Sequence, residues 1–310
     1  VEFDPAKSPP WDVKIAALTD DEHVLLINFH PIIMDDRSVE IFILELARIY
    51  QAISTGAEAT LKEHPVDYAD FALWQRQHLR DEALTPLLAY WERQLTDISH
   101  PGSALPAAGF SLKRESLPID FPPGFSEKLK ELGRREESTL FMTLLAAFQA
   151  ILYHYTGKPG IPVRTPMLNR DRKEIEDMLG TFENIVILRT DVNEMFRFSD
   201  LLSRVKLVIR GTLANLGMPF RMILKHLGLE PGQGRSLCRY MFIYRNDSPE
   251  QTECSGLTWG PVQVGKAETS ALTLRLSDTA KGINGAVDYD PRLYNNAQVE
   301  TFVEHYRVLL

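Results

Sequence analysis

Residues 30–38 read HPIIMDDRS, and the elements predicted on either side make this stretch a strand-to-helix junction. Two β-rich runs, 13–18 and 23–29, precede it and are separated by the turn-like residues TDDE. Apolar residues then recur at helical spacing over 39–53, which predicts a helix directly after the stretch. Such a junction can hold polar side chains rigidly beside unpaired backbone amides.

Taken alone, His30 near Asp35 and Asp36 has two interpretations. One is a loop histidine followed by residues that cap the helix, a role that suits Asp36 or Ser38. The other is a cluster of titratable groups with a chemical function. One histidine near two carboxylates is weak evidence for chemistry, so without further context the first interpretation is preferred.

The remaining patterns predict a mixed α/β fold with helices packed against a sheet. A stretch rich in Pro, Gly, Ser and Ala at 99–109 is typical of a hinge. The predicted helices cover 67–77, 86–95, 125–134, 139–155, 199–213 and 299–309, and the predicted strands cover 161–167, 184–190, 239–244, 260–264, 273–277 and 283–289.

The composition is that of a soluble globular protein: 44% of the 310 residues are hydrophobic and 25% are charged. The net charge of −8 repels phosphate backbones and gives no support for nucleic-acid binding. No apolar run reaches the roughly 20 residues of a membrane span, and no signal peptide is visible. We expect Cys238 and Cys254 to be reduced thiols of a cytoplasmic protein, with no metal site. Because the chain starts at Val1, we expect it to be cut from a longer polypeptide.

Five stretches, in order, resemble the condensation domains of nonribosomal peptide synthetases. HPIIMDDRS resembles the family motif of two histidines, three variable residues, Asp, Gly, one further residue and Ser. The other four stretches are VDYADFALWQ at 66–75, GTFEN at 180–184 with Asn169 and Arg170 before it, GMPF at 217–220, and MFIYRN at 241–246. Each is weak alone, but five in register over nearly the whole chain identify it as a member of this family.

The resemblance implies two chloramphenicol-acetyltransferase-like lobes in a V, with a tunnel between them. The family has a longer segment before its two-histidine motif than the 29 residues that precede His30, so the first lobe is expected to be incomplete at its N-terminus. We therefore divide the chain into 1–98, the C-terminal part of the N-terminal lobe, a hinge at 99–115, and a C-terminal lobe at 116–310. Carrier proteins would dock at either mouth of the tunnel and deliver phosphopantetheine arms. The domain itself is expected to bind no cofactor.

The resemblance also assigns the chemistry, in which an acceptor amine attacks a donor thioester. The second motif histidine positions the amine or takes its proton, a contribution of about 10²–10⁴ in rate. Pro31 holds that position and has no titratable group. The remaining catalytic-motif residues are His30, which matches the first and mainly structural histidine, and Asp35. Successive side chains of extended backbone point to opposite faces, so His30 is a poor substitute for the missing base.

In the family the motif aspartate forms a structural ion pair, for which Arg170 is the first candidate partner of Asp35 and Arg164 the second. The motif glycine is replaced by Asp36, an anionic side chain where the tunnel needs backbone room. The residues expected along the substrate tunnel are Asp36, Ser38, Gly180 and Asn184. Trp74 is expected to be a structural core residue rather than part of a cofactor site.

Three hypotheses remain open. The first is a catalytically impaired domain that docks carrier proteins or recruits a partner, like the X-domains of glycopeptide synthetases, which recruit cytochrome P450 oxygenases. The second is an active condensation domain, because positioning two tethered substrates can lower a barrier by about 7–11 kcal/mol in the best cases. The third is a decayed gene fragment. Carrier proteins and neighbouring synthetase domains are the expected partners, a cytochrome P450 is a further candidate, and neither nucleic acid nor a membrane is expected.

Overall fold

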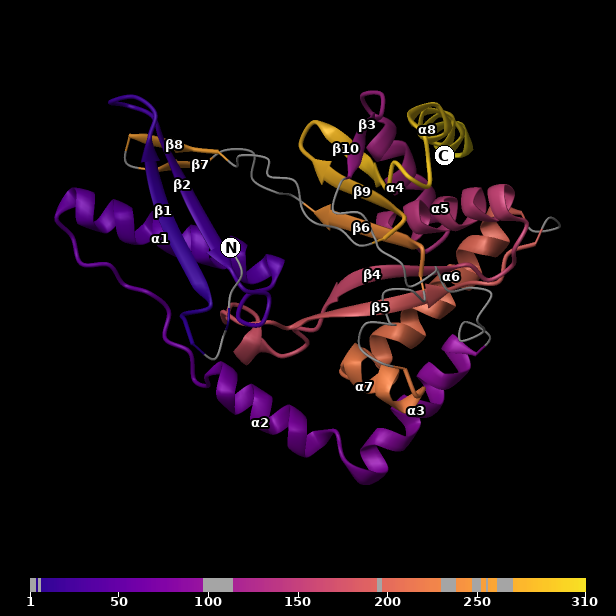
Figure 1. Ribbon diagram of the computed structural model, residues 1–310, viewed down its shortest axis with the longest axis horizontal. Helices are drawn as coiled ribbons and strands as arrows, with labels where there is room; N and C mark the ends of the chain where they lie inside the picture. Colours follow the sequence, from indigo (N-terminus) through magenta and orange to yellow (C-terminus); the bar gives the residue numbers. More distant parts are fainter. Residues whose placement is uncertain are drawn as a thin grey trace. The chain divides into compact units, whose positions relative to one another are not determined.

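The computed structural model describes residue 4 and residues 7–96, 114–193, 197–229, 238–246, 252–254, 256–260 and 270–310. The chain forms two compact units, each built from several segments (Figure 1). The first comprises Val1–Arg80, Leu168–Glu183 and Gln251–Gly260, and the second comprises Asp81–Met167, Asn184–Glu250 and Pro261–Leu310.

The first unit is built on a hairpin and two helices. Strands β1 (Trp11–Ala17) and β2 (His23–Phe29) pair antiparallel, with Trp11 opposite Phe29. Helices α1 (Asp36–Thr55) and α2 (Tyr68–His78) follow, and β7 (Thr252–Cys254) pairs with β8 (Leu257–Trp259). A short 3₁₀ turn, Lys173–Ile175, lies in the segment between β4 and β5.

The second unit is a six-stranded mixed sheet with helices packed on it. Its strand order is β3-β10-β9-β6-β4-β5, in which β3, β10 and β9 are antiparallel neighbours and β6 runs parallel to both β9 and β4. The strands are β3 (Glu115–Asp120), β4 (Pro162–Leu168), β5 (Glu183–Arg189), β6 (Tyr240–Asn246), β9 (Leu272–Thr279) and β10 (Gly282–Tyr289). The helices are α3 (Asp81–Leu95), α4 (Phe125–Arg135), α5 (Leu140–Thr156), α6 (Phe198–Ala214), α7 (Phe220–His226) and α8 (Asn296–Leu309).

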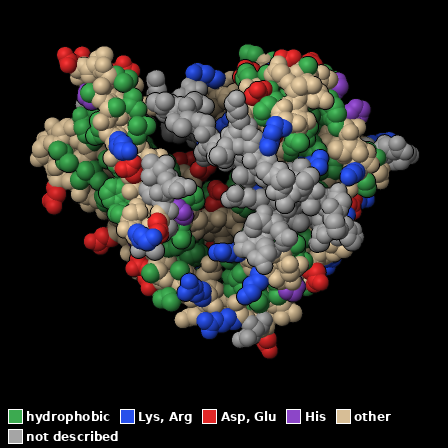
Figure 2. All heavy atoms as spheres, viewed as in Figure 1, with side chains coloured by type: hydrophobic (Ala, Val, Ile, Leu, Met, Phe, Trp, Pro, Cys, Tyr) green, Lys and Arg blue, Asp and Glu red, His purple; other side chains and the backbone are tan. Residues whose placement is uncertain are grey.

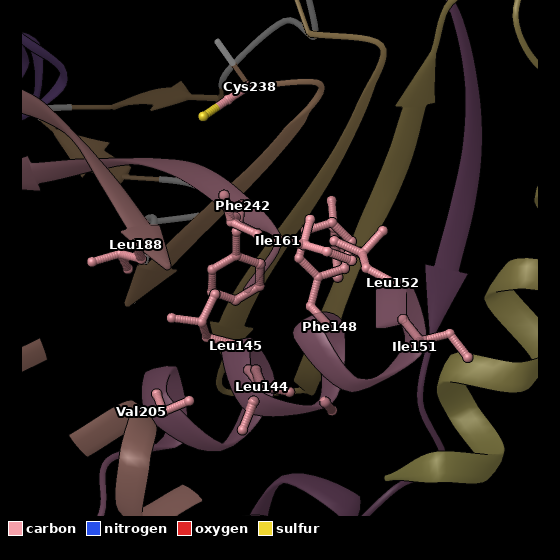
Figure 3. Close-up of a cluster of buried hydrophobic side chains, with 14 of the residues drawn as sticks. Leu144, Leu145, Phe148, Ile151, Leu152, Ile161, Leu188, Val205, Cys238 and Phe242 are labelled. Atoms are coloured by element: carbon pink, nitrogen blue, oxygen red, sulfur yellow. The ribbon is translucent and has the colours of Figure 1, made fainter. Parts of the chain in front are cut away.

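Helix α5 is the centre of the hydrophobic core of this unit (Figure 3). Leu144, Leu145 and Phe148 have no exposed surface, and the Phe148 ring stacks on that of Phe242 from β6 at a centroid distance of 5.9 Å. Thr139 caps the helix by accepting a hydrogen bond from the Met142 amide. Because the helix is apolar on nearly all sides, it can be covered by the sheet on one face and by helices on the others.

Most of the predicted elements are present, and the differences have physical causes. The sequence predicted that helix α3 begins at Pro86, because proline is common in the first turn of a helix. The helix instead begins at Asp81 and contains Pro86 in its interior. It packs in the second unit, whereas the sequence placed residues up to 98 in the first lobe. Residues 99–113 of the expected hinge and residues 261–264 of an expected strand lie outside the described residues. Strand β3, which starts at Glu115, was not predicted because its six residues include a proline.

The first unit leaves many apolar side chains exposed (Figure 2). Ile15 on β1 is 70% exposed and Ile53 on α1 is 71% exposed. The helix predicted from the apolar spacing over 39–53 is present as α1, and its buried residues are Ser38, Ile41 and Ala47.

Candidate functional site

The stretch that replaces the two-histidine motif forms a tight turn in the first unit. The Ile33 amide donates to the His30 carbonyl at 3.0 Å, which closes a β-turn with Pro31 at its second position. Proline suits that position because its fixed φ is preset for the turn and no hydrogen bond is lost with its missing N–H. The Thr181 hydroxyl donates to the Pro31 carbonyl at 2.7 Å and ties the turn to the segment between β4 and β5.

The imidazole of His30 is engaged in this turn. Its Nδ1 accepts a hydrogen bond from the backbone N–H of Ile32 at 3.0 Å. This bond holds the ring against the backbone of the turn in which Pro31 takes the second position. The part that His30 plays in any chemistry stays a prediction.

Asp35 ends the turn and begins helix α1. As the N-cap residue it has extended backbone, and its Oδ1 accepts from the Ser38 amide at 2.7 Å. Its Oδ2 accepts from the amides of Phe182 at 2.8 Å and Glu183 at 3.2 Å. Its own amide donates to the Gly180 carbonyl at 3.2 Å. The carboxylate therefore joins the start of α1 to the end of the segment between β4 and β5.

Arg170 is the ion-pair partner of Asp35, with Nη2 at 3.0 Å from Oδ1 and at 3.3 Å from Oδ2. The two side chains are 6% and 1% exposed, so the pair is buried. Arg170 also donates through Nη1 to the carbonyls of Ile175 and Met178, each at 2.7 Å. The second candidate partner, Arg164, lies in the second unit and donates to Ser270.

Ser38 completes the network with three hydrogen bonds. Its hydroxyl donates to the Gly180 carbonyl at 2.6 Å and accepts from the Gly180 amide at 3.0 Å and from Arg170 at 2.7 Å. Ser38 has no exposed surface. The Ser38 hydroxyl is therefore bonded to both backbone groups of Gly180. The placement of these two residues along a substrate tunnel stays a prediction.

The electrostatics of Asp35 follow from this bonding. Burial alone would raise the pKa of the carboxyl, but the hydrogen bonds from Ser38 and Phe182 and the charge of Arg170 together lower the pKa of Asp35 below its ordinary value. Asp35 is therefore ionised at neutral pH. A carboxylate that accepts this many hydrogen bonds and pairs with arginine is a structural anion and a poor proton acceptor.

Gly180 is required by the packing around it. A side chain at this position would collide with the ring of Tyr68, which also donates from its hydroxyl to the Thr181 carbonyl at 2.9 Å. The small hydrophobic cluster of this unit surrounds the contact and consists of Phe71, Ile175, Met178 and Phe182. The family blocks at 66–75 and 180–184 therefore meet in space, through Tyr68, Phe71 and Phe182.

Three predicted site residues are not part of the hydrogen-bond network of Asp35, Ser38 and Arg170. Asn184 lies in the second unit, where its amide bonds to the backbone of residues 216–220. Asp36 is half-buried in the first turn of α1, and its place in a tunnel stays a prediction. Trp74 is half-buried; the Arg172 guanidinium lies over its ring at 3.9 Å from the centroid, and the His78 ring stacks on it at a centroid distance of 4.9 Å.

Two contributors to the site were missed in the sequence. Thr181 and Tyr68 both lie inside quoted family blocks, but nothing in their spacing shows which backbone carbonyl each side chain would reach. Among the described residues, no group of three or more His, Cys, Asp or Glu side chains could hold a metal ion. No helix of the described part of the chain is both long and apolar enough to cross a bilayer.

Comparison with known proteins gives the same family over the whole chain. A family model described as "Condensation domain" matches residues 1–310. A linear gramicidin synthase protein of Brevibacillus parabrevis is 35% identical over 317 residues, which is 99% of this chain and 4% of that protein. The chain therefore spans only a small part of the length of this curated relative.

Solved structures agree in fold. The teicoplanin X-domain, in its complex with OxyB, matches with a TM-score of 0.84 at 23% identity and covers 99% of this chain and 71% of its own. The condensation domain of the monacolin K polyketide synthase MokA matches with a TM-score of 0.80 at 20% identity, over 100% and 73% of the two chains. This chain has the mixed α/β, two-lobed, chloramphenicol-acetyltransferase-like fold, and it belongs to the condensation-domain family of nonribosomal peptide synthetases.

Proposed function

We propose that this chain is a condensation-family domain that lacks base catalysis at its motif and acts as a docking or recruiting module of a modular synthetase. The observation that carries the proposal is the state of the motif: Pro31 has no titratable group, and His30 Nδ1 is bonded to the Ile32 amide. A positioned base is worth about 10²–10⁴ in rate, or about 3–5 kcal/mol of barrier. This contribution is absent from the two motif positions that would supply it.

A scaffold role fits the parts of the motif that are retained. Asp35, Ser38 and Arg170 form a buried network that needs no substrate to complete it. The Asp35–Arg170 pair is present although Pro31 stands where the family has its base. This combination supports a structural role for the pair at the junction. The fold is shared with a teicoplanin X-domain whose solved structure is a complex with OxyB. The partners that fit this role are carrier domains with their phosphopantetheine arms, neighbouring synthetase domains, and an oxygenase of the cytochrome P450 class.

A second candidate function is condensation by positioning alone. The observation in its favour is that the Asp35–Arg170 framework around the motif is intact, so the backbone of the junction is held as firmly as a catalytic motif would require. Holding two reactants in a productive geometry can contribute about 7–11 kcal/mol in the best cases without a base. An active domain of this kind would work slowly and with little dependence on pH near neutrality.

The test is single-turnover amide formation by the complete synthetase module that contains this chain, with donor and acceptor carriers loaded. The expected rate equals that of the same loaded carriers without the domain, and His30→Ala leaves it unchanged. A rate well above that background that falls on His30→Ala would contradict the proposal. A rate above background that survives His30→Ala would select condensation by positioning.

A further inference from the structure

The turn at 30–33 is held by two bonds between backbone groups. The His30 amide donates to the Pro10 carbonyl at 2.8 Å where the chain enters the turn, and the Ile33 amide closes the turn on the His30 carbonyl at 3.0 Å. The closing bond of a β-turn joins groups on either side of its central peptide, and turns with the same closing bond differ in the orientation of that peptide. These two bonds therefore do not by themselves fix the central peptide.

Two side chains hold that central peptide, which joins Pro31 to Ile32. Its carbonyl, that of Pro31, accepts a hydrogen bond from the Thr181 hydroxyl at 2.7 Å. Its N–H, that of Ile32, donates to His30 Nδ1 at 3.0 Å. Because a peptide unit is planar, a partner at each end fixes the rotation of the whole unit between its two Cα atoms. This rotation helps to set the direction in which the side chain at position 31 leaves the turn.

The backbone on both sides of Thr181 is itself held within the first unit. The amide before it, that of Gly180, donates to the Ser38 hydroxyl at 3.0 Å. The amide after it, that of Phe182, donates to the Asp35 carboxylate at 2.8 Å. The Thr181 hydroxyl is therefore presented to the turn from a fixed stretch of backbone. Groups that are supported in this way hold their partners more precisely than groups on a free loop.

We propose that Thr181 is a positioning residue of the motif turn: its hydroxyl orients the central peptide and so directs the side chain at position 31. Tyr68 supports Thr181 by donating from its hydroxyl to the Thr181 carbonyl at 2.9 Å. Position 31 is where the family carries its base, and a displacement of about 1 Å in a reacting group can cost about 10²-fold in rate. The inference rests on the proposed function, because it concerns the position from which the base is missing.

In the native chain the proline ring gives this turn a second restraint. The ring fixes φ of residue 31, whereas the Thr181 bond acts on the peptide that follows it. Histidine at position 31 has no such restraint on φ, and because Pro31 is exposed the new N–H can bond to water. We therefore expect the Thr181 bond to matter little in the native chain and much more after Pro31→His. Restraints that act on one residue are not additive.

The first measurement is hydrogen exchange at the Ile33 amide, which closes the turn, by mass spectrometry with electron-transfer fragmentation on the complete module. In the Pro31→His module we expect Thr181→Val to raise the exchange rate about 5–10-fold, the effect of one lost hydrogen bond. In the native background the same change should raise it about 2-fold or less. Thr181→Ser keeps the hydroxyl and should stay within about 2-fold in both backgrounds, and Tyr68→Phe should give a smaller rise than Thr181→Val.

The matched control for the lost hydroxyl is Thr55→Val. Thr55, in α1 of the same unit, also donates from its hydroxyl to a backbone carbonyl, that of Gln51 at 2.9 Å. The control removes the same kind of bond without touching the turn. Exchange at Ile33 in the Pro31→His module should then stay within about 2-fold.

A second measurement separates positioning from stability. In the complete module that carries Pro31→His with Asp36→Gly, Thr181→Val should lower kcat for amide formation about 10-fold and leave KM for the acceptor carrier within about 2-fold. Thr181→Ser should keep the full rate, because its hydroxyl can still reach the carbonyl of residue 31. A loss of the same size in Thr55→Val would show that general destabilisation is the cause and would overturn the inference.

Exchange decides the inference independently of amide formation. Equal exchange at Ile33 with and without Thr181→Val in the Pro31→His module would overturn it. An effect of Thr181→Ser as large as that of Thr181→Val would overturn it as well, since the hydroxyl would then not be what holds the turn. If the module with Pro31→His and Asp36→Gly forms no amide, that result counts against the rescue expected from the proposed function, and exchange at Ile33 still decides the role of Thr181.

Discussion

The two units of this chain are stabilised internally by different interactions. The second unit has a continuous hydrophobic core in which Leu144, Leu145 and Phe148 have no exposed surface. The first has a small cluster around Phe71 and Phe182, and its motif junction depends on a buried ion pair with its hydrogen bonds. Apolar packing is distributed over many contacts, whereas a buried charge network depends on every partner being present. The difference shows where single substitutions should have concentrated effects.

The largest effect is expected at the ion pair. Asp35→Ala leaves the Arg170 charge buried without its partner and removes the cap of α1, so unfolding of the first unit should become easier by about 3–5 kcal/mol. Hydrogen exchange followed by mass spectrometry should show faster exchange in α1 and in residues 168–183, with the second unit still protected. The control is Asp36→Ala, which changes the adjacent carboxylate and should cost less than about 1 kcal/mol. Equally small losses of stability in Asp35→Ala and Asp36→Ala would show that the ion pair does not stabilise the first unit.

A core truncation should give the opposite pattern. Phe148→Ala deletes a fully buried ring between α5 and β6 and should cost about 3–5 kcal/mol, because the surrounding core cannot collapse fully into the cavity. Exchange should then accelerate in the sheet of the second unit and remain slow at the motif junction. If Phe148→Ala and Asp35→Ala accelerate exchange in the same residues, the two units do not depend on different interactions.

A smaller effect is expected at Gly180. Gly180→Ala places a methyl group against the Tyr68 ring, and the strain should destabilise the first unit by about 1–3 kcal/mol. The double variant Gly180→Ala with Tyr68→Ala removes the two closest contacts and leaves only the Phe182 ring at 2.9 Å, so the two losses should add incompletely in urea unfolding. The control is Gly217→Ala, where no atom lies within 4 Å of the added carbon. Strictly additive losses in the double variant would show that the collision does not occur.

The pH dependence of the first unit should be modest and confined to acid. The pKa of Asp35 is lowered in the folded state, so its contribution is fully present above the unfolded pKa of about 3.9 and is lost as the pH falls through the lower folded value. Asp35→Asn should flatten the dependence between about pH 5 and pH 2 relative to wild type, in unfolding followed by circular dichroism. An unchanged slope in Asp35→Asn would show that other carboxylates dominate acid unfolding.

The sequence predicted the family and most of the longer helices and strands, but not the short elements β3, α7, β7 and β8 or the full set of contacts around the site. The five blocks quoted from the sequence include Tyr68, Gly180 and Phe182, which meet in the structure. The pairing of Asp35 with Arg170 was expected from the resemblance alone. No local pattern shows that Ile32 would donate to His30, because that bond depends on the turn conformation that Pro31 sets.

The boundary between the units was also beyond sequence patterns. Helix α3 and the segment 168–183 each pack away from their neighbours in the sequence, and such choices depend on tertiary contacts. Asn184 was expected along a substrate tunnel because it follows Gly180 in one block. Its three bonds to the turn between α6 and α7 involve residues more than 30 positions later in the chain, which local reasoning does not reach.

The central claim is that the motif junction is an intact scaffold that lacks a base. The most direct test is amide formation between two loaded carriers by the complete module carrying Pro31→His together with Asp36→Gly. Because the turn at 30–33 accepts histidine at its second position and Asp35–Arg170 already holds the junction, the account predicts a rise of up to about 10²-fold over wild type, with Asp36→Gly alone giving no such rise. Robust amide formation by the wild-type module that falls on His30→Ala, with no increase from the double substitution, would contradict it.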